Sequence, residues 1–374
     1  MSDSREKLRA SKRWVVKIGS ALITDKGCGL KHERLNTWIA QVAELGKRGI
    51  EVVIVSSGAV AEGITRLGWK QRPTQVHQLQ AAAAVGQMGL IQAYEVGFQK
   101  YGKHTAQILL THEDVANRER YLNARTSINT LIGLGVIPVI NENDSVATEE
   151  IRFGDNDTLA GMVANLIEAD VLVLLTDQDG LYTADPNRDK NAELISEASV
   201  NDTKLDDYAG EGGALGRGGM RTKIKAARIA ARSGSQTVIA PGNEQNVMLR
   251  IADAEAIGTL LTGTEETVNA RRLWLAGQGK MNGSVSIDDG AVRALKENNK
   301  SLLPVGIKSV NGEFNRGEVI ACLDMNGKEI ARGLTNYNSS QARTIMGKSS
   351  QDIQALLGNL DEDEFIHRDN LLVN

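Results

Sequence analysis

The strongest constraint on the fold is an alternation through the first two thirds of the chain, where short apolar runs are followed by longer segments with helical spacing. The apolar runs are continuous, as is typical of strands covered on both faces of a sheet. We predict strands at residues 14–18, 51–56, 105–110, 136–140, 171–176 and 237–240, and helices at residues 35–48, 79–101, 118–133, 158–169 and 222–233. This order predicts a three-layer αβα sandwich with a mostly parallel sheet.

The pattern changes after about residue 260, where short strands are broken by Gly and Asn. We predict these strands at residues 284–287, 306–310, 318–323 and 329–334. Short strands with frequent turns are typical of a small, mainly β domain, and a chain of 374 residues is long enough for two domains. We therefore predict a first domain over residues 1–265, a linker over 266–281, a second domain over 282–360 and a C-terminal tail over 361–374.

Charge and cysteine content exclude several classes of protein. The 43 Lys and Arg residues against 47 Asp and Glu residues give a net charge of −4, which argues against a protein held to nucleic acid mainly by its charge. No apolar run approaches the roughly 18 residues that a membrane-spanning helix needs, and the start of the chain lacks the apolar segment of a secretory signal. The two cysteines, Cys28 and Cys322, form no CxxC pair. We expect a soluble cytoplasmic protein without a disulfide scaffold, a membrane partner or a nucleic-acid partner.

Polar residues follow the first two predicted strands, at the end of a parallel sheet where ligands bind. Lys17 comes just before Gly19 and Ser20, a small-residue turn that lets a phosphate approach the backbone. Ser56 and Ser57 precede a segment compatible with a helix, whose N-terminus favours an anion. The simpler alternatives are a strand-end lysine that faces solvent and an ordinary N-cap.

Further polar groups follow the later strands. Residues 141–144 (Asn-Glu-Asn-Asp) come directly after a strand, and residues 154–157 (Gly-Asp-Asn-Asp) precede a helix. A surface turn and a helix cap are the simpler interpretations, but three Asx residues at one helix start exceed what capping needs. Thr176 and Asp177 follow the fifth strand and are further candidates for a functional role.

A glycine-rich stretch, residues 216–223, leads into an Ala-rich helix. Its glycines allow the backbone to wrap phosphate oxygens, the helix N-terminus favours negative charge, and Lys223 adds a positive charge. A flexible loop without a ligand is the alternative. The chain has neither a GxxxxGK[ST] string nor a GxGxxG string, which counts against a Walker A loop and a dinucleotide-binding domain. The histidines show no metal-ligand spacing, and no GxSxG string indicates a hydrolase.

Taken in order, these segments resemble the amino acid kinase superfamily, most closely its glutamate 5-kinases of bacterial type. The resemblance covers nearly the whole chain and rests on the joint order of the segments. The strings that carry it are VVKIGS (15–20), SSGAV (56–60), PVINENDSVAT (138–148), GDND (154–157), LLTDQDGLYTADP (174–186) and GGMRTK (218–223). The second domain resembles a PUA domain through SLLPVGIKSV (301–310), FNRGEVI (314–320) and IARGLTNYNS (330–339).

The resemblance implies ATP-dependent phosphorylation of the γ-carboxylate of L-glutamate to L-glutamyl 5-phosphate, the first step of proline biosynthesis. It implies that glutamate is bound by Ser57, Asp144 and Asn156. It implies that ATP is bound by Lys17, Thr176, Asp177, Arg217, Gly218, Gly219, Met220, Arg221, Thr222 and Lys223. Feedback inhibition by proline and a homodimer or homotetramer are also implied. Arg217 departs from the pattern, because a small hydroxyl residue is expected there, so only backbone contacts to phosphate are expected at this position.

The implied chemistry gives roles to three charged residues. A glutamate carboxylate is already ionised at neutral pH, so it needs no general base. The obstacle is its repulsion from the triphosphate, roughly 4 kcal/mol for two unit charges about 4 Å apart at an effective dielectric of about 20. We expect Lys17, Lys223 and a Mg²⁺ ion held largely by the ATP phosphates to offset this repulsion, while Asp157 holds the two lysines in place.

Two other functions stay open on the sequence. Within the same fold, the chain could phosphorylate another acid or a nucleoside monophosphate. In a different class, it could bind RNA through its PUA-like domain and carry a kinase-like domain without activity. The lack of a basic excess in that domain and the presence of Lys17, Asp157 and Lys223 argue against the second alternative.

Overall fold

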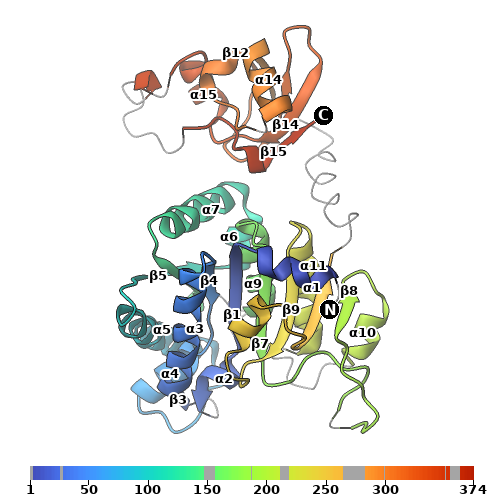
Figure 1. Cartoon of the computed structure of the whole chain (residues 1–374). Helices are drawn as coiled ribbons and strands as arrows, with labels where there is room; N and C mark the ends of the chain where they lie inside the picture. The colour runs from blue at the N-terminus through green and yellow to red at the C-terminus, as the bar shows by residue number, and fades with distance from the viewer. Residues whose placement is uncertain are drawn as a thin grey trace. The chain divides into compact units, whose positions relative to one another are not determined.

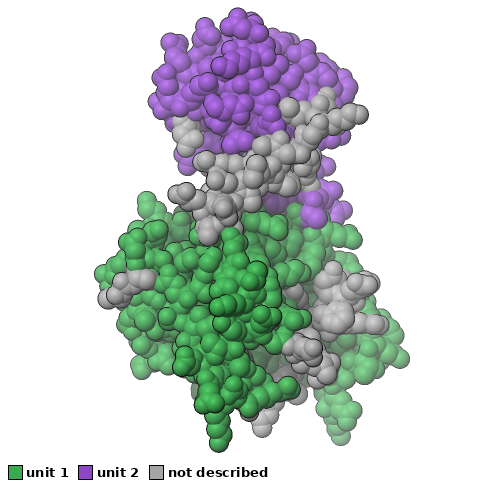
Figure 2. All heavy atoms as spheres, turned by 90° about the vertical axis from the view of Figure 1, so that its right-hand side faces the viewer, with its two compact units in different colours: residues 1–115, 124–268 green, residues 116–123, 269–374 purple. Residues whose placement is uncertain are grey.

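The computed structural model describes residues 3–25, 28–146, 156–186, 188–210, 219–263, 283–298, 300–349, 351–353 and 363–374. The chain forms two compact units, one of residues 1–115 and 124–268 and the other of residues 116–123 and 269–374 (Figure 2). Each unit has its own hydrophobic core. The predicted linker over 266–281 lies outside the described residues, and the domain limits given above stay predictions.

A sheet of 8 strands forms the centre of the first unit, in the order β5-β6-β4-β1-β7-β9-β10-β8 (Figure 1). The strands are β1 (Arg13–Ile18), β4 (Glu51–Val55), β5 (Thr105–Leu110), β6 (Ile137–Glu142), β7 (Val171–Thr176), β8 (Glu197–Ser199), β9 (Gln236–Pro241) and β10 (Thr259–Thr262). In the spatial order from β5 through β6, β4, β1 and β7 to β9, each strand pairs in parallel with the next, and β10 then pairs antiparallel with β9. The predicted fold class is therefore confirmed. The edge strand β8 and its neighbour β10 were not predicted, because they are short and carry polar residues.

Two layers of helices cover the sheet (Figure 1). The longer helices are α3 (His32–Lys47), α4 (Ala59–Arg66), α5 (Val76–Gln99), α7 (Arg118–Gly133), α9 (Asn156–Leu166), α11 (Met220–Ala231) and α12 (Val247–Ala252). The shorter ones are α1 (Asp3–Glu6), η1 (Lys7–Ala10), α2 (Ser20–Ile23), α6 (His112–Ala116) and α10 (Lys204–Tyr208), and β2 (Thr24–Asp25) pairs with β3 (Cys28–Leu30) as a separate ribbon.

The alternation of side chains along β1 decides what Lys17 faces. Trp14, Val16 and Ile18 are buried in one core together with residues of α3, α5 and α12. Because successive side chains point to opposite faces of a strand, Lys17 points to the other face. On that face α9 packs against β1 and against α11.

Helices α4 and α5 approach each other until their backbones touch. A Cβ atom on Gly63 would lie 1.7 Å from the carbonyl oxygen of Ala82, and one on Gly86 would lie 1.8 Å from that of Ala59. Only glycine fits at these two positions. The contact fixes α5 relative to the start of α4, which directly follows the serines at the end of β4.

The N-terminal segment, to which no role was assigned from the sequence, is anchored to the first unit by the buried side chains of Arg5 and Leu8. The guanidinium of Arg5 donates hydrogen bonds to the carbonyl oxygens of Ser196, Glu255, Ile257 and Gly258, at 2.7, 3.0, 3.2 and 3.1 Å. These carbonyls lie next to β8 and β10, so Arg5 ties the chain start to the antiparallel edge of the sheet.

We expect Arg5→Ala to lower the free energy of unfolding of the first unit by roughly 3 kcal/mol, because carbonyl groups buried against Arg5 lose charge-assisted hydrogen bonds. Urea unfolding followed by circular dichroism measures this loss. Arg9→Ala is the matched control, since Arg9 is exposed and its bonds to the carbonyl oxygen of Asp253 and to the carboxylate of Glu6 are exposed too. Its effect should stay within about 0.5 kcal/mol. Equal effects of the two substitutions would contradict the anchoring role of Arg5.

The second unit contains a sheet of 5 strands in the order β12-β11-β13-β14-β15. Its elements are β11 (Gly283–Ile287), α14 (Asp289–Asn298), η2 (Pro304–Gly306), β12 (Ile307–Gly312), β13 (Val319–Leu323), β14 (Glu329–Leu334), α15 (Ser339–Ile345), η3 (Arg368–Asn370) and β15 (Leu371–Val373). We predicted a tail from residue 361, but β15 pairs with β14, and Phe365 and Ile366 are buried in the core. No helix of the described residues combines the length and the apolar character needed to cross a membrane.

Candidate active site

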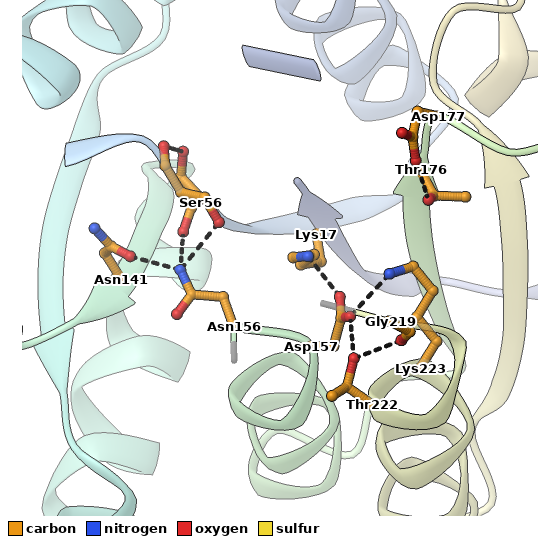
Figure 3. A network of polar contacts seen from close by, with 11 residues as sticks. Lys17, Ser56, Asn141, Asn156, Asp157, Thr176, Asp177, Gly219, Thr222 and Lys223 are labelled. Atoms are coloured by element: carbon orange, nitrogen blue, oxygen red, sulfur yellow. Dashed lines mark hydrogen bonds and ion pairs between the residues drawn. The ribbon is translucent and has the colours of Figure 1, made fainter. Parts of the chain in front are cut away.

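Side chains from the carboxyl ends of several parallel strands gather at one edge of the sheet (Figure 3). Lys17 lies near the end of β1, Ser56 and Ser57 follow β4, and Asn141 lies near the end of β6. The turn after β4 depends on Gly58, whose φ of +99° belongs to the left-handed region. Thr176 ends β7, so the strands that flank β1 on both sides contribute polar groups.

A buried carboxylate joins the two lysines singled out by the sequence. Asp157 Oδ1 lies 2.5 Å from Lys17 Nζ, and Asp157 Oδ2 lies 2.9 Å from Lys223 Nζ (Figure 3). The side chain of Asp157 is fully buried, and those of Lys17 and Lys223 are only 6% and 5% exposed. Thr222 Oγ1 lies 2.8 Å from Asp157 Oδ2. Strand β1 and helices α9 and α11 thus bring Lys17, Asp157 and Lys223 into one cluster, which we call the Lys–Asp–Lys cluster.

The electrostatics of this cluster favour an ionised Asp157. Burial by itself raises the pKa of this carboxyl, but the two ammonium groups of Lys17 and Lys223 outweigh burial and lower the pKa to about 2. Burial also lowers the pKa of Lys223, while the charge of Asp157 opposes that shift. A carboxylate with so low a pKa, and with both oxygens occupied by donors, is a poor proton acceptor at neutral pH.

The residue before Asp157 points to a different group of side chains. Consecutive residues of a helix lie about 100° apart around its axis, so Asn156 and Asp157 at the start of α9 contact two different groups of side chains. Asn156 Nδ2 donates to the carbonyl oxygen of Ser56 at 2.7 Å, to Asn141 Oδ1 at 2.9 Å and to Ser57 Oγ at 3.1 Å. The structure therefore brings Ser57 and Asn156 together.

Two supporting residues of this group were not predicted as site residues. Asn141 Nδ2 donates to Gln87 Oε1 at 2.8 Å, and both side chains are buried. Asn141 belongs to the polar residues 141–144, which the sequence placed directly after a predicted strand and the structure places at the end of β6. Gln87 gives no sequence signal, because a glutamine in an Ala-rich helix is ordinarily exposed.

Asp144 follows β6 in the turn after residue 142. Burial raises the pKa of its carboxyl to about 6, and the positive charge of Arg72 opposes the shift. No hydrogen bond between Asp144 and Ser57 or Asn156 is found among the described residues, so its membership of one site with them stays a prediction. Asp155 and Gly154 lie outside the described residues.

The predicted nucleotide residues lie on β7 and at the start of α11. Thr176 Oγ1 donates to Asp177 Oδ1 at 3.1 Å, and the charge of Asp177 acts on Lys223 (Figure 3). Gly219 is the N-cap of α11, whose first residues are Met220, Arg221 and Thr222. Free N–H groups at a helix start favour an anion. The other predicted residues of this loop, Arg217 and Gly218, lie outside the described residues.

The described residues contain no cluster of side chains that could ligate a metal ion by itself. No group of three His, Cys, Asp or Glu side chains among them is arranged to hold one. Asp157, the carboxylate nearest the two lysines, has both oxygens engaged by ammonium groups.

Comparison with known proteins gives matches to both units. The Amino acid kinase family pattern matches residues 12–241, and the PUA domain pattern matches residues 283–357. A glutamate 5-kinase of Nitrosospira multiformis is 58% identical over 98% of this chain and 99% of its own length. A glutamate 5-kinase of Chromohalobacter salexigens is 56% identical over 100% of this chain and 98% of its own length. The chain therefore belongs to the amino acid kinase family.

Proposed function

We propose that the chain transfers the γ-phosphoryl group of ATP to the γ-carboxylate of L-glutamate. The product is L-glutamyl 5-phosphate, and the reaction is the first step of proline biosynthesis. Relatives named glutamate 5-kinase match over nearly their full length and over nearly all of this chain. The observation that carries the proposal is the Lys–Asp–Lys cluster, two buried cations next to a cluster of amide and hydroxyl groups.

The mechanism follows from the charges. The glutamate carboxylate is ionised at neutral pH and attacks without losing a proton, so the enzyme needs no base. Lys17 and Lys223 lower the repulsion between that carboxylate and the triphosphate, and they stabilise charge on the transferred phosphoryl group. Asp157 keeps the two ammonium groups from repelling each other and fixes their positions. Asp157 is thus a positioning residue.

The remaining predicted residues bind the two substrates. Thr176, Asp177 and the start of α11 bind ATP, with backbone N–H groups and the helix N-terminus facing the phosphates. When bound, Mg²⁺ supplies positive charge to the phosphate oxygens. The glutamate is held by Ser57, Asp144 and Asn156, whose carboxylate, amide and hydroxyl groups suit an ammonium and a carboxylate.

Trapping of the product tests the proposed function. With L-glutamate, Mg-ATP and hydroxylamine, the protein should form γ-glutamyl hydroxamate, because hydroxylamine captures an acyl phosphate. ADP release in the presence of other acids and of nucleoside monophosphates is the comparison. Faster turnover of one of these acceptors in the absence of glutamate would assign a different substrate. Salt-dependent RNA binding without ATP turnover would reject a kinase altogether.

The pKa of Asp144 leads to a prediction about pH. An ionised Asp144 attracts the substrate ammonium, and with a pKa of about 6 its ionised fraction falls to about one tenth at pH 5. We expect KM for glutamate to rise about 10-fold between pH 7.5 and pH 5, while it stays nearly constant between pH 7 and pH 8. Initial rates across this range measure the change. Asp144→Asn is the control and should have a high KM that no longer depends on pH in this way.

Assembly, location and regulation are further parts of the proposal. Helix α5 exposes apolar side chains on one stripe, with Val85, Met88 and Val96 exposed by 36%, 67% and 53%. Exposed apolar stripes of this kind are typical of protein interfaces, so we propose a homodimer or homotetramer. Analytical ultracentrifugation of the wild type and of Met88→Lys would test this assembly.

We also propose a cytoplasmic location, where ATP is available and Cys322 stays a thiol. We further propose that proline inhibits the enzyme, because proline resembles glutamate in its ammonium and carboxylate groups.

A further inference from the structure

The hydrogen bonds that Asn156 makes to described residues leave its Oδ1 as the atom available to a ligand. Its Nδ2 carries two hydrogens and already faces three acceptors, of which the carbonyl oxygen of Ser56 accepts only. The carbonyl oxygen of Ser56 and Asn141 Oδ1 together therefore fix the orientation of the Asn156 amide. Asn156 is 8% exposed, and Oδ1 has no hydrogen bond within the part of the chain that the structure describes. Asn156 thus offers a ligand an acceptor and no donor.

Ser57 offers the opposite polarity. Its Oγ accepts a hydrogen bond from Asn156 Nδ2, which leaves the hydroxyl hydrogen available for a ligand oxygen. An acceptor on Asn156 beside a donor on Ser57 fits an ammonium group next to a carboxylate, as in an α-amino acid.

A second layer of amides holds this arrangement. Asn141 Oδ1 accepts from Asn156 Nδ2 and from the backbone N–H of Glu142, so Asn141 Nδ2 must point the other way. There it donates to Gln87 Oε1, and Gln87 is 7% exposed. The second amide atom of Gln87, Nε2, is buried and makes no hydrogen bond to any described residue. Among the described residues, the one hydrogen bond of the Gln87 side chain is therefore the bond that holds Asn141 Nδ2.

Helix α5 supports the site at two points of one face. Gln87 meets Asn141, and Tyr94, seven residues later, lies with its hydroxyl 3.0 Å from Ser56 Oγ. Residues seven apart lie on the same helix face. Gly86 lets α5 come close enough for these contacts, since a Cβ there would meet the carbonyl oxygen of Ala59 at 1.8 Å.

We propose that Gln87 is a positioning residue for recognition of the substrate ammonium: through Asn141 it holds Asn156 so that Asn156 Oδ1 accepts from that group. The inference rests on the proposed function and specifies how its amino-acid site distinguishes an amino acid from a plain dicarboxylic acid. Among the described residues, Gln87 bonds to Asn141 and has no hydrogen bond to the Lys–Asp–Lys cluster, so its effect should appear in glutamate binding and leave the phosphoryl transfer unchanged.

The test compares Gln87→Met, which keeps the shape of the side chain and removes its acceptor, with Gln87→Glu. We expect Gln87→Met to raise KM for glutamate about 5- to 10-fold, the effect of losing one buried hydrogen bond, with kcat and KM for ATP within about twofold of wild type. Gln87→Glu keeps an oxygen acceptor for Asn141, and burial favours the uncharged form of the introduced carboxyl group. KM for glutamate in this variant should therefore lie within about twofold of the wild-type value. Gln92→Met, at an exposed position of the same helix, is the control and should equal wild type.

Glutarate distinguishes positioning from simple packing, because it has both carboxylates of glutamate and no ammonium. We expect Gln87→Met to reduce the preference for glutamate over glutarate, expressed as a ratio of kcat/KM values, by about the same 5- to 10-fold. An unchanged preference, or an equal defect in Gln87→Glu, would overturn the role of Gln87. Absence of glutamate turnover in the wild type would instead reject the proposed function, so the two failures are distinguishable.

Discussion

Replacing Lys223 by Ala should lower kcat for glutamate phosphorylation about 100-fold or more, the cost of one preorganised donor at a developing charge. KM for ATP should rise less, because the start of α11 still offers its backbone N–H groups. Hydroxamate formation and coupled ADP release measure the loss. The buried ammonium of Lys223, 2.9 Å from Asp157 Oδ2, is the group removed.

Lys225→Ala is the matched control for this variant, because Lys225 lies two residues later on α11 and is exposed. Its kcat should stay within about twofold of wild type. A Lys223→Ala variant with turnover close to that of Lys225→Ala would contradict the role of Lys223. Equal unfolding temperatures of the two variants would exclude a folding defect as the cause of a difference.

Replacing Asp157 by Asn should give the largest loss of stability, about 3–5 kcal/mol at pH 7, because two buried ammonium groups lose their counter-charge. The pKa of Asp157 is lowered to about 2, so its contribution is complete above the unfolded pKa of about 4. It is lost as the pH falls from about 4 to 2. The difference between wild type and variant should shrink over this range in urea unfolding experiments.

Mg-ATP should restore part of the stability of Asp157→Asn, since the phosphates supply negative charge to both lysines. The nucleotide should therefore raise the unfolding temperature of the variant more than that of wild type. Asp206→Asn is the control, because the exposed ion pair of Asp206 with Arg228 should be worth no more than about 1 kcal/mol. A loss in Asp157→Asn as small as in Asp206→Asn would contradict the counter-charge role.

The sequence predicted the parallel strands of the sheet, including the edge strand β5, and missed β8 and β10 at the other end. Buried parallel strands are continuous apolar runs, so β1, β4, β5, β6, β7 and β9 could be recognised. The edge strand β8 and its neighbour β10 pair with few residues and show no such run, and β15 was taken for part of a tail. Their conformation depends on a neighbouring strand from a distant part of the chain.

For the candidate site, the sequence indicated residue types and the structure decided which of them meet. A lysine at the end of an apolar strand faces either solvent or a cleft, and only its register, on the face opposite Trp14 and Val16, directs Lys17 to Asp157. Gln87 could not be identified, because nothing in its helix indicates that it is buried against Asn141, which lies 54 positions later in the chain.

The sequence alone determined the alternating order of strands and helices, the lack of a charge excess, and the set of polar residues that follow the strands, since these depend on local composition and spacing. Tertiary structure alone decided that Lys17 and Lys223, more than 200 positions apart, share one carboxylate, and that Asn156 and Asp157 serve different groups. The physical reason is that charge pairing and hydrogen-bond direction depend on distances of a few ångströms, which exist only once the parallel strands and their covering helices are packed together.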